Sequence, residues 1–190
     1  YKNLFLPGTK LNFGENLLSK NTNEKAITFI SENGFREERS WNKLNSNTAS
    51  IVNFFKEIKI RKGDRIAAYM PNCIEAVEAF IATSSIGGIW SSCSPDFGAD
   101  GVIERFSQIN PRVLFITDQY FYNGKKIKII GRLSKILKLI PSIKTVIIVN
   151  YPGKKFLKNY KKFKQQQLLK WTDCFKKKPQ ESNFKKYDFE

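Results

Sequence analysis

Three serine hydroxyls and one carboxylate gather in residues 91–98 (SSCSPDFG). Gly87 and Gly88 precede this polar stretch and let the backbone turn without a Cβ penalty. Pro95 and Asp96 give it a turn signature. In an α/β protein, a polar loop that leaves a buried layer and returns to it through a helix and a strand is a favourable place for a ligand. The same residues also fit an ordinary surface connection, so their types and spacing leave both interpretations open.

Two carboxylates, Glu75 and Glu78, lie three positions apart within residues 74–86, a segment with helical spacing. Paired carboxylates on one helix face can do general acid–base chemistry. They are also the only charges of this segment, and a helix that is otherwise apolar is covered on most of its surface. The spacing therefore favours a narrow solvated stripe over an acid–base pair.

The chain contains no histidine, and its three cysteines, Cys73, Cys93 and Cys174, are far apart without a CxxC pair. This composition excludes Ser–His and Cys–His nucleophiles, and it argues against the usual zinc sites and against a disulfide scaffold. The GxGxxG, Walker A and HExxH patterns are also absent from the 190 residues. We therefore predict no catalytic residue and no metal ligand within this sequence.

Unpaired cysteines and the lack of a secretory signal pattern fit a reducing compartment, so the sequence predicts a cytoplasmic protein. The longest apolar run, near residues 76–82, is too short to cross a bilayer, and no membrane partner is expected. The chain begins with Tyr1 rather than Met, which fits a piece of a longer protein.

Lysine dominates the charge, because 26 Lys and 7 Arg against 17 acidic residues give a net charge of +16. Such a field attracts polyanions, either nucleic acid or a smaller nucleotide or coenzyme. Nucleic-acid sites usually show Arg with interleaved aromatic residues, so we expect no nucleic-acid partner. The alternative is a non-catalytic basic α/β module that binds a polyanion through a stripe within residues 128–138 and a Lys-rich C-terminal tail.

Regular elements must position these side chains. Apolar spacing of about 3.6 residues predicts helices, and short apolar runs bounded by turn residues predict buried strands. Repeated strand–helix units imply a mostly parallel sheet flanked by helices, that is, an α/β fold with an N-terminal hairpin. The predicted strands are residues 26–30, 35–39, 65–70, 112–117 and 144–149, and the predicted helices are residues 41–58, 74–86, 100–109 and 125–140, with Ser40 and Asp100 as N-caps.

The composition divides the chain into three segments, residues 1–22, 23–150 and 151–190. The first is irregular, the second holds the sheet, and the third is a Lys-rich connection with a short helix near residues 165–171. Trp171 and Phe175 are expected to dock the third segment on the domain. An unpaired sheet edge and poor solubility of the isolated chain are expected after the last strand.

Several motifs together resemble one family, the AMP-forming adenylating enzymes, and within it the acetoacetyl-CoA synthetases (acetoacetate–CoA ligases) more than the acetyl-CoA synthetases. The similarity runs from Tyr1 to about Val149 and weakens through the Lys-rich tail. The motifs are residues 5–18 (FLPGTKLNFGENLL), 62–66 (KGDRI), 70–72 (MPN), 75–79 (EAVEA), 89–92 (IWSS), 94–98 (SPDFG), 105–109 (RFSQI) and 122–125 (YNGK).

The resemblance implies a two-step ligase that uses ATP, with Mg²⁺, and CoA as substrates and activates acetoacetate through an acyl-adenylate. It also implies that the phosphate loop, the adenine pocket and the catalytic Lys lie beyond Glu190. We therefore expect residues 23–150 to be the N-terminal part of the adenylation domain, and we expect the chain to be inactive alone. The acid and the oligomeric state stay open.

One ligand site is carried over by the resemblance. Related enzymes hold the nucleotide end of CoA with a short basic turn at the position of Tyr122, Asn123, Gly124 and Lys125. The acetyl-type enzymes tend to place Arg there, whereas Lys125 would act on phosphate as a point charge rather than as a bidentate fork. Trp90 and the serines after it are expected to shape the fold near the active cleft.

Overall fold

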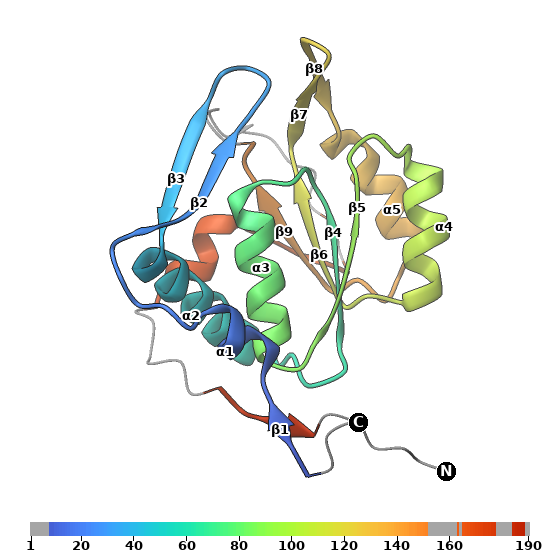
Figure 1. Cartoon of the computed structure of the whole chain (residues 1–190). Coiled ribbons are helices and arrows are strands. Elements are labelled where there is room, and N and C mark those ends of the chain that lie inside the picture. The colour runs from blue at the N-terminus through green and yellow to red at the C-terminus, as the bar shows by residue number, and fades with distance from the viewer. Residues whose placement is uncertain (1–7, 152–162, 164, 178–183, 189–190) are drawn as a thin grey trace, which may run out of the picture.

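The computed structural model describes residues 8–151, 163, 165–177 and 184–188. At its centre lies a five-stranded parallel sheet in the order β10-β9-β6-β4-β5 (Figure 1). The chain enters the sheet at β4, adds β5 on one side and then continues on the other side, so its winding direction reverses between β4 and β6. The strands are β4 (Arg65–Tyr69), β5 (Ile89–Cys93), β6 (Val113–Thr117), β9 (Thr145–Val149) and β10 (Gln167–Lys170).

Helices cover both faces of this sheet (Figure 1), which confirms the predicted α/β fold with a parallel sheet flanked by helices. One face carries α2 (Trp41–Glu57) and α3 (Ile74–Ser85), and the other carries α4 (Ala99–Ile109) and α5 (Leu133–Leu139). Among the described residues, no helix is long and apolar enough to cross a membrane.

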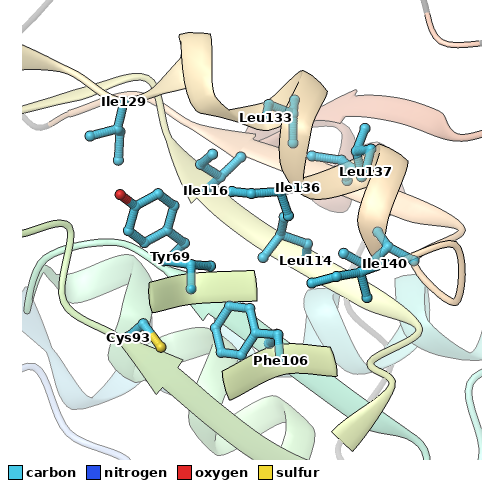
Figure 2. Close-up of a cluster of buried hydrophobic side chains, with 14 of the residues drawn as sticks. Tyr69, Cys93, Phe106, Leu114, Ile116, Ile129, Leu133, Ile136, Leu137 and Ile140 are labelled. Carbon is cyan, nitrogen blue, oxygen red and sulfur yellow. The ribbon is translucent and has the colours of Figure 1, made fainter. Parts of the chain in front are cut away.

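The strands feed two separate cores because successive side chains of a strand point to opposite faces. In β6, Leu114 belongs to the core under α4 and α5, whereas Phe115 belongs to the core under α2 and α3. Figure 2 shows the first core, where Phe106 of α4 and Ile136 of α5 lie close to Leu114. All three of these side chains are fully buried, so the sheet and its helices form one packed unit.

Two antiparallel hairpins project from the same end of the sheet (Figure 1). The first is the predicted N-terminal hairpin, β2 (Lys25–Ile30) with β3 (Arg36–Ser40), and the second is β7 (Gln119–Tyr122) with β8 (Lys125–Lys128). The remaining elements are β1 (Lys10–Leu11), which pairs with β11 (Tyr187–Asp188), α1 (Phe13–Leu17), and the 3₁₀ turns η1 (Ile130–Arg132) and η2 (Trp171–Phe175).

The helix starts are only partly as predicted. Ser40 is the N-cap of α2, and its hydroxyl accepts the Lys43 backbone N–H at 3.3 Å. For α4, the prediction of Asp100 as N-cap is wrong, because Gly98 is the N-cap and Asp100 already lies in the first helical turn. There its carboxylate still complements the positive end of the helix and pairs with Lys135 at 2.6 Å.

Two segments were assigned to the wrong kind of element. Residues 89–93, expected in a loop, form the edge strand β5, whose Ile89 is 51% exposed. A short strand with a half-solvated pattern gives little local signal, and its pairing with β4 decides its structure. Residues 125–128, expected as the start of a helix, form β8 because the turn before them returns the chain as a hairpin, and α5 begins only at Leu133.

The described part of the C-terminal segment extends the sheet. The expected short helix near residues 165–171 is instead strand β10, which pairs with β9 in parallel, so the expected unpaired edge at β9 is wrong. Docking by Trp171 is confirmed, since its ring lies 6.0 Å from that of Phe115 and 5.4 Å from that of Phe175. Much of the predicted Lys-rich tail, and residues 5–7 of the first motif, lie outside the described residues.

Candidate functional site

A pocket of about 500 Å³ opens at the carboxyl ends of β4, β5 and β6. In open α/β sheets, ligands bind outside the carboxyl ends of the strands where the winding direction reverses, and this pocket lies at that point of the sheet. Its walls are residues 27–29 of β2, residues 70–74 after β4, residues 76, 77 and 80 of α3, residues 90 and 92–96 along and after β5, and residues 120–122 of β7.

The polar stretch that follows β5 forms one wall of this pocket. Ser92, Ser94 and Asp96 all line it, which supports the ligand-site interpretation of residues 91–98 over an ordinary surface connection. The Asp96 carboxylate accepts the Ser94 hydroxyl at 2.8 Å and the Tyr120 hydroxyl at 2.8 Å. Burial, together with the Asp96 carboxylate, raises the pKa of Tyr120 to about 12, so Tyr120 stays a donor at neutral pH.

Arg132 of η1 holds the same loop through its backbone carbonyl groups. Its guanidinium donates to the carbonyl oxygens of Pro95 at 3.0 Å and Phe97 at 2.8 Å, and also to the Tyr69 hydroxyl. Burial raises the pKa of Tyr69, so its own hydroxyl proton is available to Phe97 O. Sequence reasoning missed this cluster, because Tyr69 and Arg132 are 63 positions apart and no local pattern joins them.

The residues assigned to CoA form the apex of the β7–β8 hairpin. Asn123 and Gly124 have φ values of 49° and 70°, which suit a two-residue hairpin turn, and Tyr122 pairs directly with Lys125 across it. Tyr122 is 56% exposed and lines the pocket, whereas Asn123, Gly124 and Lys125 lie at the exposed tip beyond it. Exposed Lys126 and Lys128 on β8 add to the positive charge of the hairpin.

The two cysteines that line the pocket do not form a nucleophilic or metal-binding centre. Both are buried and free, and burial raises the pKa of the Cys73 and Cys93 thiols, so they stay protonated at neutral pH. Within the described residues, no group of three or more His, Cys, Asp or Glu side chains could hold a metal ion.

The predicted solvated stripe of carboxylates is wrong. Glu78 is fully buried against Arg39 of β3 and Asn47 of α2. Burial raises the pKa of Glu78 and also that of Glu75. The hairpin strand that buries this side of α3 could not be placed from helical spacing alone. These acids lie outside the pocket lining, which does not support an acid–base pair acting on a pocket ligand.

Comparison with known proteins relates the chain to one enzyme family and to named members of it. The sequence pattern of the AMP-binding enzyme family matches residues 17–186. The chain is 38% identical over 146 residues to acetoacetyl-CoA synthetase of Macaca fascicularis and 38% identical over 149 residues to acetoacetyl-coenzyme A synthetase of Rhizobium meliloti (strain 1021). These alignments cover 76% and 78% of this chain but only 22% and 23% of the relatives, so the chain spans about a fifth of their length.

A solved structure agrees with the sequence comparison. The acetoacetyl-CoA synthetase from Streptomyces lividans superposes with a TM-score of 0.85 at 30% sequence identity. The match covers 96% of this chain and 27% of that protein. The arrangement of sheet, helices and hairpins described above is therefore also present in part of a larger enzyme.

Proposed function

The chain belongs to the AMP-binding enzyme family, and on this premise we propose that it forms the N-terminal part of an AMP-forming acid–CoA ligase that activates acetoacetate. One observation carries the proposal: five of the motifs that resemble such ligases contribute residues to one pocket, namely residues 70–72, 76 and 77, 90 and 92, 94–96, and 122. In this proposal residues 23–150 begin the adenylation domain, residues 1–22 precede it, and residues 151–190 connect it to the remainder.

The proposed reaction has two steps. A carboxylate oxygen of acetoacetate attacks the α-phosphorus of ATP, and pyrophosphate leaves to give acetoacetyl-AMP. The sulfur of CoA then attacks the acyl carbon of the adenylate, AMP leaves with the electron pair of the broken C–O bond, and the thiol proton passes to solvent. Mg²⁺ would enter with ATP, because it coordinates phosphate oxygens and keeps several of its water ligands.

Within this reaction we assign the described site to CoA rather than to ATP. Tyr122, Asn123, Gly124 and Lys125 form an exposed two-residue turn next to the pocket, and their neighbours on β8 are lysines. A Lys ammonium can contact a coenzyme phosphate as a point charge, and an aromatic ring such as that of Tyr122 offers a flat surface to the coenzyme. The polar wall of residues 92–96 contributes to the same binding surface.

The partners proposed for the protein are small molecules: acetoacetate, ATP and CoA. Free, buried cysteines support a reducing location, and we place the protein in the cytoplasm. Fractionation of cells that express a tagged form, with enrichment in the soluble cytoplasmic fraction, tests this location. The net charge of +16 serves in this proposal to attract anionic substrates rather than nucleic acid.

Acetoacetate-dependent exchange of labelled pyrophosphate into ATP tests the function. We expect exchange with the protein expressed from its complete coding sequence, a stronger signal with acetoacetate than with acetate, and AMP release only when CoA is added. Preference for another acid would change the substrate but keep the ligase class, whereas no exchange with any short acid would overturn the proposal.

The same exchange assay on the 190-residue chain alone tests whether the catalytic groups lie outside this chain. Because it spans about a fifth of the length of its relatives, we expect it to show no exchange. Adenylate formation by this chain alone would contradict the assignment of the catalytic groups to another part of the protein.

A further inference from the structure

The β2–β3 hairpin has two roles in the geometry of the pocket. Residues 27–29 of β2 form one wall of the pocket, although they lie more than 40 positions before the other walls in the sequence. The neighbouring strand β3 faces α3 instead, through Arg39. The contacts of Arg39 therefore help to fix the position of the wall that β2 supplies.

The anchor between β3 and α3 is a buried ion pair. The Glu78 side chain is 0% exposed, and its Oε1 accepts from Arg39 Nε at 2.9 Å and from Asn47 Nδ2 at 2.8 Å. Asn47 belongs to α2, so three elements meet at one carboxylate oxygen. The second oxygen, Oε2, is buried and has no hydrogen-bond partner among the described residues. A buried carboxylate that satisfies only one of its oxygens is unstable in its ionised form.

The charges around Glu78 add to this instability. From β3 it faces Arg39, which also pairs with Glu37 at 3.0 Å, and from its own helix it faces Glu75. The α2 helix contributes only the neutral Asn47 amide, and the Cys73 thiol, which is protonated, hydrogen-bonds Glu75. The Arg39 guanidinium is thus the cation that balances three carboxyl groups, those of Glu37, Glu75 and Glu78. Protonation of one carboxyl group removes part of the excess negative charge.

We propose that Glu78 is a positioning residue whose proton determines how firmly the β2–β3 hairpin is held against α3, and thereby how well the β2 wall of the pocket is formed. The proposal requires no substrate, and it stands apart from the ligase assignment. It gives the pocket a built-in dependence on pH that acts through the hairpin rather than through a group that touches the ligand.

Proton binding by Glu78 and docking of the hairpin are thermodynamically linked, which sets the direction of the pH effect on docking. In the docked hairpin, burial raises the pKa of Glu78 from 4.5 to about 7, against the opposing pull of Arg39. When the hairpin opens, water reaches the carboxyl and its pKa returns toward the ordinary value. The docked state therefore binds the proton more tightly. Docking is strongest below about pH 4.5, weakens by at most about tenfold per pH unit as the pH rises, and levels off above about pH 7.

Hydrogen exchange measured peptide by peptide between pH 5 and 8 tests the proposal on the chain without any ligand. After correction for the intrinsic effect of pH on exchange, protection of residues 25–40 should fall by roughly fortyfold from pH 5 to pH 7. Amides of β6 and β9 report global unfolding in the same experiment. A hairpin whose protection does not change with pH in the unmodified chain would overturn the proposal.

Substitutions separate Glu78 from the other acids. Glu78→Gln keeps an oxygen acceptor but cannot ionise, so its hairpin protection should be independent of pH, while the exposed Glu104→Gln on α4 should keep the full slope. An unchanged slope in Glu78→Gln would exclude Glu78 as the responsible group. Arg39→Gln is the second variant: loss of the cation raises the pKa of the docked Glu78 further, so the decline in protection should extend above pH 7.

Discussion

At the scale of single residues, the hairpin apex shows how one tight turn places an aromatic ring and a cation next to the pocket. Asn123 and Gly124 adopt positive φ angles, which Asn and Gly tolerate better than other residues, and so Tyr122 and Lys125 face each other at the end of the strands. Tyr122 reaches the pocket and Lys125 reaches solvent beside it. In the proposed CoA assignment, this single turn would offer both an aromatic surface and a cation to a coenzyme that has an aromatic base and phosphates.

Lys125→Ala should weaken CoA use without affecting adenylate formation. An exposed ammonium that meets a phosphate contributes little on its own, so we expect the KM for CoA to rise by roughly two- to fivefold. The measurement is steady-state kinetics of the protein expressed from its complete coding sequence, alongside acetoacetate-dependent pyrophosphate exchange, which should stay unchanged. Lys138→Ala removes the same charge from α5, away from the hairpin, and should leave the KM for CoA unaltered. An equal KM in Lys125→Ala and the unmodified enzyme would remove the CoA assignment.

At the scale of elements, the loop after β5 is held by partners from three separate parts of the fold. Tyr69 comes from the end of β4, Tyr120 from β7 and Arg132 from η1, and all three contact the segment from Pro95 to Phe97. These contacts are tight because two of the loop carbonyls share one guanidinium, and hydrogen bonds to a charged donor are stronger than neutral ones. Contacts within the protein therefore hold the loop as a wall of the pocket.

Arg132→Ala should loosen this wall. It leaves the Pro95 and Phe97 carbonyl oxygens without their charged donor, and we expect a loss of about 1–2 kcal/mol in the free energy of unfolding. Chemical denaturation measures the loss, and hydrogen exchange of residues 94–98 should increase more than that of β9. Arg105→Ala is the matched control: Arg105 lies 4.1 Å from the Phe97 ring and donates only to Gly101 O within its own helix, so it should have a smaller effect on the loop. Equal exchange in both variants would show that Arg132 does not hold the wall.

At the scale of the whole molecule, the winding of the sheet brings distant segments to one edge. Residues 70–74, 92–96 and 120–122 lie at or just after the carboxyl ends of three strands that are neighbours in the sheet, with β4 between β5 and β6. These segments therefore meet at one edge. Residues 27–29 of β2 line the same pocket. Around it, a net charge of +16 creates a positive field that favours anions over long distances.

This field predicts a salt dependence that differs from that of a nucleic-acid-binding protein. For CoA, kcat/KM should fall several-fold between about 50 and 300 mM NaCl, while kcat stays nearly constant, because screening weakens attraction before contact. Binding of short oligonucleotides should be weak and without saturation. Saturable oligonucleotide binding with a steep salt slope, together with CoA kinetics that do not depend on salt, would favour the basic binding module instead.

How much of the architecture was predictable varied with the strength of the local signal. The hairpin at residues 25–40, helix α2 with its Ser40 cap, and strands β4, β6 and β9 were predicted because apolar runs and turn residues mark them clearly. Strand β5 and strand β10 were missed because edge strands are half-solvated, and their pairing partners decide their structure. Strand β8 was missed because three lysines around one Ile fit a helix surface as well as a hairpin.

For the candidate site, the sequence by itself determined the chemical types: no histidine, a polar Ser/Asp loop and the turn from Tyr122 to Lys125. Residue types and the spacing of a motif can be read directly from the sequence, because both are local properties of the chain. Only the tertiary structure decided that β2 forms a wall of the pocket, that Arg132 holds the Pro95–Phe97 carbonyls, and that Glu78 is buried against Arg39. The hydrogen bonds among these contacts join residues 35 or more positions apart in the chain. Burial depends on which elements pack together, so these contacts cannot be predicted from composition or periodicity.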